Sequence, residues 1–228
     1  MSKAIRNNIP NAITSLNLLF GSIACIMALT PSCTVTTYRM AFLFIALSAV
    51  ADFFDGLVAR MLHAVSAIGK ELDSLADLVS FGLAPALILY SMMANQDYYP
   101  WEFCALLLPV FGALRLARFN IDTNQATTFT GLPIPANAIF WIGFTDWYAQ
   151  HTCPTWVVIL LIVLLSLLMV SPLRMFSLKM HNLSSLKHNW AQYLQVLATV
   201  AAVVILGLPG LAVAIALYVL LSIIKREE

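Results

Sequence analysis

The chain has 228 residues, of which 61% are hydrophobic and 10% are charged, and its formal net charge is +1. A soluble domain usually carries about 25% charged residues, so this composition places the chain among integral membrane proteins. The nearly balanced charge leaves no basic surface of the kind that binds nucleic acid, and we expect no such partner.

Eight hydrophobic segments are candidates for helices that cross a membrane, which needs about 20 mostly apolar residues per helix. In chain order they cover residues 12–29, 40–61, 68–93, 101–119, 135–147, 156–170, 190–206 and 208–224. The segment 135–147 is the shortest, and the turn signal at residues 207–210 separates the last two. The sequence therefore predicts an all-α, polytopic membrane bundle that forms one domain over residues 1–228.

Basic residues fall on alternate connections of this eight-helix arrangement. Eleven of the 12 lie on one side, and Arg39 is the exception. Cytoplasmic loops are enriched in Lys and Arg, so we expect both termini to face the cytoplasm and the protein to lie in the cytoplasmic (inner) membrane. The eleven residues are Lys3, Arg6, Arg60, Lys70, Arg115, Arg118, Arg174, Lys179, Lys187, Lys225 and Arg226.

Four of the seven aspartates, Asp52, Asp55, Asp73 and Asp77, lie within one stretch of 26 residues. Each ionised carboxylate inside a membrane costs about 2.5 kcal/mol or more, so a cation or a watery cavity must compensate them. Spacings of three and four residues place each pair on one helix face, and a short connection makes the two helices neighbours. Such an oxygen-rich site suits Mg²⁺ or Mn²⁺, and four carboxylates could hold two ions.

Small and basic residues surround these carboxylates. Gly56, Ala59 and Gly69 keep their helix faces open, so that a ligand could lie against the backbone. Arg60 could grip a phosphate with two donors, and Ser66 offers a hydroxyl nearby. Two other interpretations are charges with structural partners and a cation-coupled transporter, in which intramembrane carboxylates also serve.

Written out, the stretch is Asp52-x-x-Asp55-Gly56-x-x-Ala59-Arg60, eight residues, then Gly69-x-x-x-Asp73-x-x-x-Asp77. It resembles the signature of the CDP-alcohol phosphatidyltransferases at every fixed position. The resemblance implies that a CDP-linked lipid donates its phosphatidyl group to an alcohol and releases CMP. It also implies that the four aspartates bind two divalent ions, and that Asp77 is the general base for the attacking hydroxyl.

The resemblance further implies a binding site for the CDP-lipid, formed by Gly56, Ala59, Arg60, Ser66 and Gly69. The start of the first hydrophobic segment also resembles the family, and there Asn11 and Thr14 could hydrogen-bond the cytidine. For Asn11, the N-cap of an ordinary helix start is an equal alternative.

Four segments, residues 69–74, 78–86, 114–120 and 129–135, resemble the phosphatidylserine synthase branch of the family, whose acceptor is L-serine. Relatives in the family also suggest a homodimer. Serine needs a cation for its carboxylate, which Lys70, Arg115 or Arg118 could supply, and Ser80 could help shape the acceptor pocket. The alternatives are topological anchoring for the two arginines and helix packing for Ser80. The sequence also allows glycerol phosphate, inositol phosphate or choline as the acceptor alcohol. His63, in the connection between the two aspartate-bearing segments, is predicted to be an exposed loop residue.

Overall fold

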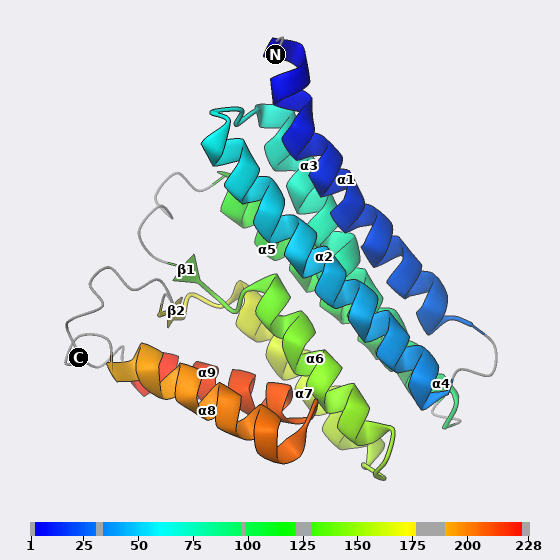
Figure 1. Ribbon diagram of the computed structural model, residues 1–228. Coiled ribbons are helices and arrows are strands. Elements are labelled where there is room, and N and C mark those ends of the chain that lie inside the picture. Colours follow the sequence, from blue (N-terminus) through cyan, green and yellow to red (C-terminus); the bar gives the residue numbers. More distant parts are fainter. Residues whose placement is uncertain (1–2, 31–33, 97–98, 122–128, 177–189, 225–228) are drawn as a thin grey trace. The chain divides into compact units, whose positions relative to one another are not determined.

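The computed structural model describes residues 3–30, 34–96, 99–121, 129–176 and 190–224 (Figure 1). Within these residues the chain forms eight helical segments, one for each segment that the hydropathy predicts. The chain divides into two compact units, Met1–Ala113 and Leu114–Glu228, and each is described by itself.

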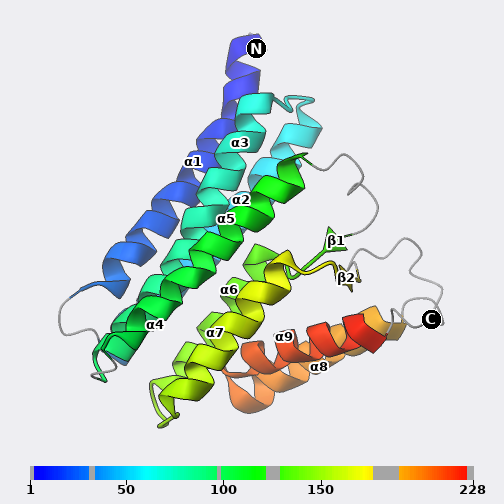
Figure 2. The same ribbon diagram turned by 180° about the vertical axis from the view of Figure 1, so that it is seen from behind.

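The first unit consists of long helices that pack side by side. Its elements are α1 (Lys3–Ala28), α2 (Val35–Met61), α3 (Ala67–Asp77), the π-helical turn η1 (Leu78–Leu83), α4 (Ala84–Ala94), the 3-10 turn η2 (Trp101–Leu106) and the first half of α5 (Leu107–Ile121). Helix α1 packs along α2 and also contacts α3, η1 and α4. Figure 2 shows α3 continuing into α4, so that the aspartates of α3 lie on a long helix.

Two helix starts differ from the sequence-based expectation. Helix α2 begins five residues before residue 40, because Thr34 accepts a hydrogen bond from the backbone N–H of Thr37 and forms a capping box there. Helix α1 begins at Lys3, so Asn11 lies inside the helix, and its interpretation as the N-cap is wrong. Hydropathy marks the apolar part of a helix, and polar residues continue α1 beyond it.

The helix that carries Asp73 and Asp77 changes its winding directly after Asp77. Residues Leu78–Leu83 form a π-helical turn, in which the N–H of Ala84 bonds to the carbonyl of Val79. Pro85 follows at the start of α4 and lacks the N–H that an α-helix would use next. Such π-turns occur mostly as single insertions in α-helices, often at functional sites.

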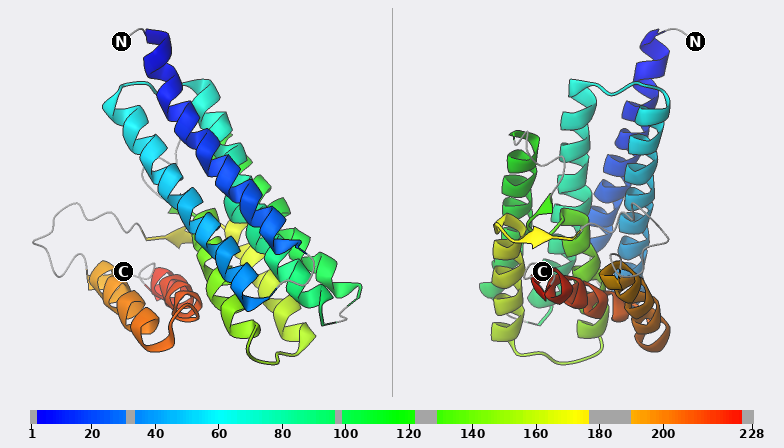
Figure 3. Two further views of the ribbon diagram at one scale, coloured as in Figure 1. Left: turned by 45° about the vertical axis from the view of Figure 1, so that its right-hand side comes forward. Right: turned by 90° about the vertical axis from the view of Figure 1, so that its left-hand side faces the viewer.

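The second unit contains α6 (Ile134–Tyr148), α7 (Thr155–Val170), α8 (Trp190–Leu206) and α9 (Gly210–Ile224), together with the second half of α5. Helix α9 packs against α6 and α8 (Figure 3). Two short strands, β1 (Phe129–Thr130) and β2 (Arg174–Met175), pair antiparallel, with Phe129 opposite Met175. This pair is a small departure from the all-α expectation.

Among the described residues, four helical segments are long and apolar enough to cross a membrane: Asn8–Ala28, Val35–Met61, Ala67–Ala94 and Trp101–Ile121. Helices α7, α8 and α9 are apolar but have only 16, 17 and 15 residues. The described residues therefore belong to a multi-pass membrane protein. Eight spans and cytoplasmic termini stay predictions, and Lys179, Lys187, Lys225 and Arg226 lie outside the described residues.

Candidate active site

Three of the four aspartates converge where α2 and α3 meet. One carboxylate oxygen each from Asp52, Asp55 and Asp73 lies within 4.8 Å of the other two. The helical spacing predicts this meeting, because residues three or four apart share a helix face. At such distances each pair of ionised carboxylates repels by about 3–4 kcal/mol at an effective dielectric constant of about 20. The cluster is therefore costly unless a cation or a proton compensates it.

Two buried oxygen atoms of this cluster make it a fit for a divalent cation. Asp55 Oδ2 and Asp73 Oδ1 are buried and have no hydrogen-bond partner among the residues that the structure describes. A buried polar atom without a partner costs free energy, so these oxygens are ready to accept a ligand. Carboxylate oxygens are also the ligands that Mg²⁺ and Mn²⁺ prefer. Asp52, Asp55 and Asp73 would hold the ion.

Asp77 lies one turn beyond Asp73, within electrostatic reach of the other three carboxylates. Its Oδ1 accepts a hydrogen bond of 3.2 Å from Nδ2 of Asn17, a residue of α1. Asp77 thus has a protein partner that Asp55 Oδ2 and Asp73 Oδ1 lack. Asn17 is fully buried, and the sequence-based interpretation missed it. The available signal was an amide side chain in the middle of an apolar helix, where polar groups are expensive.

A cavity of about 210 Å³ opens beside the carboxylates, between α1, α2 and α3. All seven residues that the sequence nominates for the CDP-lipid line it: Asn11, Thr14, Gly56, Ala59, Arg60, Ser66 and Gly69. Asp55 and Asp73 line the same cavity, so two of the clustered carboxylates and the nominated binding residues share one space. Arg60 and Lys70, both exposed, add positive charge to the lining.

The two glycines of the signature serve this cavity in different ways. Among the described residues, a Cβ added at Gly56 would meet nothing within 4 Å, so it would project into open space. A Cβ added at Gly69 would lie 3.0 Å from Asn11 Oδ1 and from Ser66 Oγ, where there is little room. Ser66 is the N-cap of α3, and its Oγ accepts a hydrogen bond from the Gly69 N–H. The wall near Gly69 is close-packed, whereas Gly56 keeps the cavity open.

Thr14 connects the first helix to the carboxylate cluster. It is buried, and its hydroxyl donates to the carbonyl of Pro10 at 3.1 Å. The hydroxyl also lies within hydrogen-bonding reach of Asp55. Asn11, one turn earlier, faces Gly69. Both residues of α1 that the sequence nominates therefore face the site.

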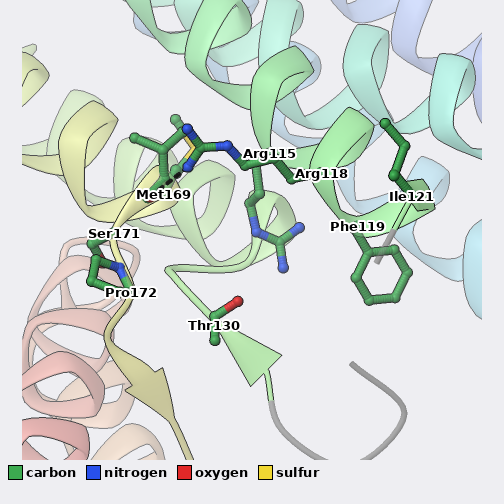
Figure 4. A pocket seen from close by; sticks show the side chains of 9 residues that line it. Arg115, Arg118, Phe119, Ile121, Thr130, Met169, Ser171 and Pro172 are labelled. Atoms are coloured by element: carbon green, nitrogen blue, oxygen red, sulfur yellow. Dashed lines mark hydrogen bonds between the residues drawn. The ribbon is translucent and has the colours of Figure 1, made fainter. Parts of the chain in front are cut away.

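The residues nominated for the acceptor fall in three places. Lys70 lines the cavity just described. Arg115 and Arg118 line a separate cavity of about 500 Å³ within the second unit, with Thr130 and the chain that follows α7 (Figure 4). There Arg118 donates from Nη1 to the carbonyl of Val170 at 2.9 Å. Each of the two cavities lies within one unit, Lys70 in the first and the two arginines in the second.

Ser80, the fourth acceptor nominee, is fully buried in η1. Its Oγ lies 2.7 Å from Oδ1 and 3.1 Å from the backbone oxygen of Asn17. His63 is exposed, as expected, and ends the turn after α2 with a positive φ of 47°.

Together, the membrane helices, the carboxylate cluster that could hold a divalent ion and the cavity with its basic rim are typical of a membrane enzyme that acts on a phosphate-bearing ligand. The profile of the CDP-alcohol phosphatidyltransferases matches residues 7–148. This match covers more than half of the chain and includes every residue of the carboxylate cluster and its cavity, so the chain belongs to the CDP-alcohol phosphatidyltransferase family. The membership favours the enzyme over the alternative of a cation-coupled transporter.

The relatives carry the name of the branch that residues 69–74, 78–86, 114–120 and 129–135 predict. A Bacillus subtilis protein is 43% identical over 129 residues, which are 57% of this chain and 70% of that protein. A Methanocaldococcus jannaschii protein is 33% identical over 218 residues, 95% and 93% of the two chains. A Mycobacterium leprae protein is 38% identical over 180 residues, 74% of this chain, and the match spans only 59% of that longer protein. Each of the three is named CDP-diacylglycerol–serine O-phosphatidyltransferase.

Proposed function

We propose that this enzyme transfers the phosphatidyl group of CDP-diacylglycerol to the hydroxyl of L-serine, which gives phosphatidylserine and CMP. The observation that carries the proposal is the cavity that joins two of the clustered carboxylates, Asp55 and Asp73, to all seven residues nominated for the CDP-lipid. The names of the relatives support serine as the acceptor.

The cavity residues suit a nucleotide diphosphate next to the metal cluster. Arg60 lies at the rim and can pair with a phosphate through two parallel donors. Gly56 leaves the space into which a ligand can press against α2. Asn11 and Thr14 present an amide and a hydroxyl from α1, which are suitable partners for polar groups of the cytosine. These residues bind and orient the donor, and orientation alone accounts for a large part of catalysis in transfer reactions.

Asp77 is the general base in this proposal. Its carboxylate takes the proton from the serine hydroxyl, because a neutral hydroxyl is a poor nucleophile. The serine oxygen then forms a bond to the phosphorus that carries diacylglycerol, and the bond from that phosphorus to the CMP oxygen breaks. Two divalent ions, Mg²⁺ or Mn²⁺, held by Asp52, Asp55, Asp73 and Asp77, would neutralise the charge that develops on the diphosphate.

The acceptor would be recognised by groups outside the signature. Arg115 and Arg118 are suitable partners for the serine carboxylate, and they already line a cavity together. We further expect eight membrane spans, a site on the cytoplasmic side of the inner membrane and a homodimer. Water-soluble CMP and serine agree with a site that opens to the cytoplasm.

The test is CMP release by the purified protein with CDP-diacylglycerol and Mn²⁺ or Mg²⁺. L-serine is compared with glycerol 3-phosphate, inositol phosphate and choline. Release that depends on serine and is lost with EDTA would support the class, the metal and the acceptor. Release with another alcohol alone would overturn the assignment of serine, while the reaction class and the metal requirement would stand. No release with any acceptor would overturn the proposed reaction.

A further inference from the structure

A buried polar cluster connects α1 to Asp77 and has no part in the mechanism so far. At its centre is Asn17, whose side chain is completely buried. Asn17 donates from Nδ2 to Asp77 Oδ1 at 3.2 Å, while its Oδ1 lies 2.7 Å from the hydroxyl of Ser80. Both ends of the amide are therefore engaged, and one of the partners is the carboxylate assigned as the base.

Asp77 and Ser80 engage opposite ends of the Asn17 amide. An ionised carboxylate only accepts hydrogen bonds, so the NH₂ end of the amide is the end that faces Asp77. The amide oxygen is then turned toward Ser80, whose hydroxyl donates to it. The same Ser80 hydroxyl is 3.1 Å from the backbone oxygen of Asn17, so both acceptors near it belong to one residue. Ser80 thus faces Asn17 in this structure.

The packing of η1 against α1 holds this arrangement in place. A Cβ added at Gly21, one turn after Asn17, would lie 2.8 Å from the Ser80 Cα and would also strike the Ser80 Oγ. No side chain fits there without a shift, because real Cβ contacts are wider than this. The close approach of α1 and the π-turn is therefore what brings Ser80 to Asn17.

We propose that Asn17 and Ser80 are positioning residues that hold the Asp77 carboxylate in its reactive orientation. Asn17 acts on Asp77 directly, and Ser80 acts through Asn17. Asn17 occupies one carboxylate oxygen and so fixes where the other one lies. This inference rests on the proposed role of Asp77 as the base, and it gives Ser80 a different task from contact with the acceptor.

The test is a double-mutant cycle with Asn17→Ala, Ser80→Ala and the double variant, all as full-length protein. For each we would measure kcat, the KM values for serine and CDP-diacylglycerol, and the Tm with and without Mn²⁺. Ser48→Ala is the matched control. Ser48 is also fully buried, and its hydroxyl donates at 3.1 Å to the backbone oxygen of Asn17 but is not bonded to its side chain.

Asn17→Ala should lower kcat about 10- to 100-fold, since a displacement of about 1 Å at a reacting group can cost 10²-fold. Both KM values should stay within about threefold, because the cavity is intact. Ser80→Ala should lower kcat less, and the double variant should match Asn17→Ala, because effects transmitted through one residue are not additive. Ser48→Ala should keep kcat within about threefold, and all variants should retain the rise of Tm with Mn²⁺.

A higher KM for serine in Ser80→Ala at unchanged kcat would overturn the proposal and favour direct contact with the acceptor. Full additivity in the cycle, or equal losses of kcat in Ser48→Ala, would also overturn it. If Asn17→Ala does not fold, Ser80→Ala still decides between a change in kcat and a change in serine KM. Asp77→Asn is measured alongside. If Asp77→Asn stays active, the proposed base is wrong. If Asp77→Asn is inactive while Asn17→Ala is fully active, only the positioning role is refuted.

Discussion

The substitution Gly56→Ala separates the binding role of the cavity from the stability of the helices around it. An added Cβ meets no atom of the described residues within 4 Å, and Gly56 lines a cavity of about 210 Å³. Alanine in a helix interior is favoured over glycine by about 0.5–1 kcal/mol, so the variant should be as stable as the parent or more so. For a chain of this size the gain corresponds to at most about 2–4 °C in Tm.

The same substitution, Gly56→Ala, should weaken the binding of the donor CDP-diacylglycerol. One misplaced methyl group in a binding pocket costs about 1–3 kcal/mol, or about 10- to 200-fold. We therefore expect the KM for CDP-diacylglycerol to rise about 10-fold or more, while the KM for serine changes little. The assay is CMP release at varied donor concentration, together with a thermal unfolding curve for each variant.

The reciprocal change Ala59→Gly, one turn later in α2, is the control. It makes the opposite exchange in the same helix and should lower stability by about 1 kcal/mol, which checks the helix-propensity part of the argument. An unchanged donor KM in Gly56→Ala would refute the placement of the nucleotide in this cavity. A lower Tm in Gly56→Ala would show that the site is closed in solution.

Four further predictions concern the carboxylates and the turns. Asp77→Asn should leave the protein folded and reduce CMP release by about 10²-fold or more, since general-base catalysis contributes about 10²–10⁴-fold; activity above a tenth of the parent would contradict its role. EDTA should abolish CMP release, and added Mn²⁺ or Mg²⁺ should restore it. In a metal titration of the rate, Asp73→Asn should need a higher metal concentration than the parent to reach half its maximal rate. Gly131→Ala should cost several kcal/mol of stability, because Gly131 has a φ of 72° and its added Cβ would strike the carbonyl of Met169; a normal Tm and yield would contradict this. His63→Gly should keep full activity and Tm, since His63 is exposed at a positive φ that glycine adopts freely; loss of metal response would instead place it at the site.

The site was predictable from the sequence to the extent that helical geometry fixes it. Asp52 and Asp55 are three apart and Asp73 and Asp77 are four apart, so each pair must share a face. The short connection between α2 and α3 favours an arrangement in which the two faces lie close together. One carboxylate oxygen each from three of the four aspartates lies within 4.8 Å of the others. The open space at Gly56 follows equally from the absence of a side chain.

Asn17 could not be assigned in the same way. It lies 60 residues from its partner Asp77, and no local spacing relates two residues on different helices. Ser80 shows the same limit, because its direction depends on the π-turn at Leu78–Leu83 and on the close approach at Gly21.

The sequence by itself determined that this is a helical membrane protein, through its composition and hydropathy. The spacing of the aspartates and of the small residues near them determined the acidic site and the groove beside it. These properties depend on neighbours within a few residues. The tertiary structure decided which side chain hydrogen-bonds Asp77, and that Lys70 lines a cavity of the first unit while Arg115 and Arg118 line a cavity of the second. Those outcomes depend on contacts between segments far apart in the chain, and only packing selects among them.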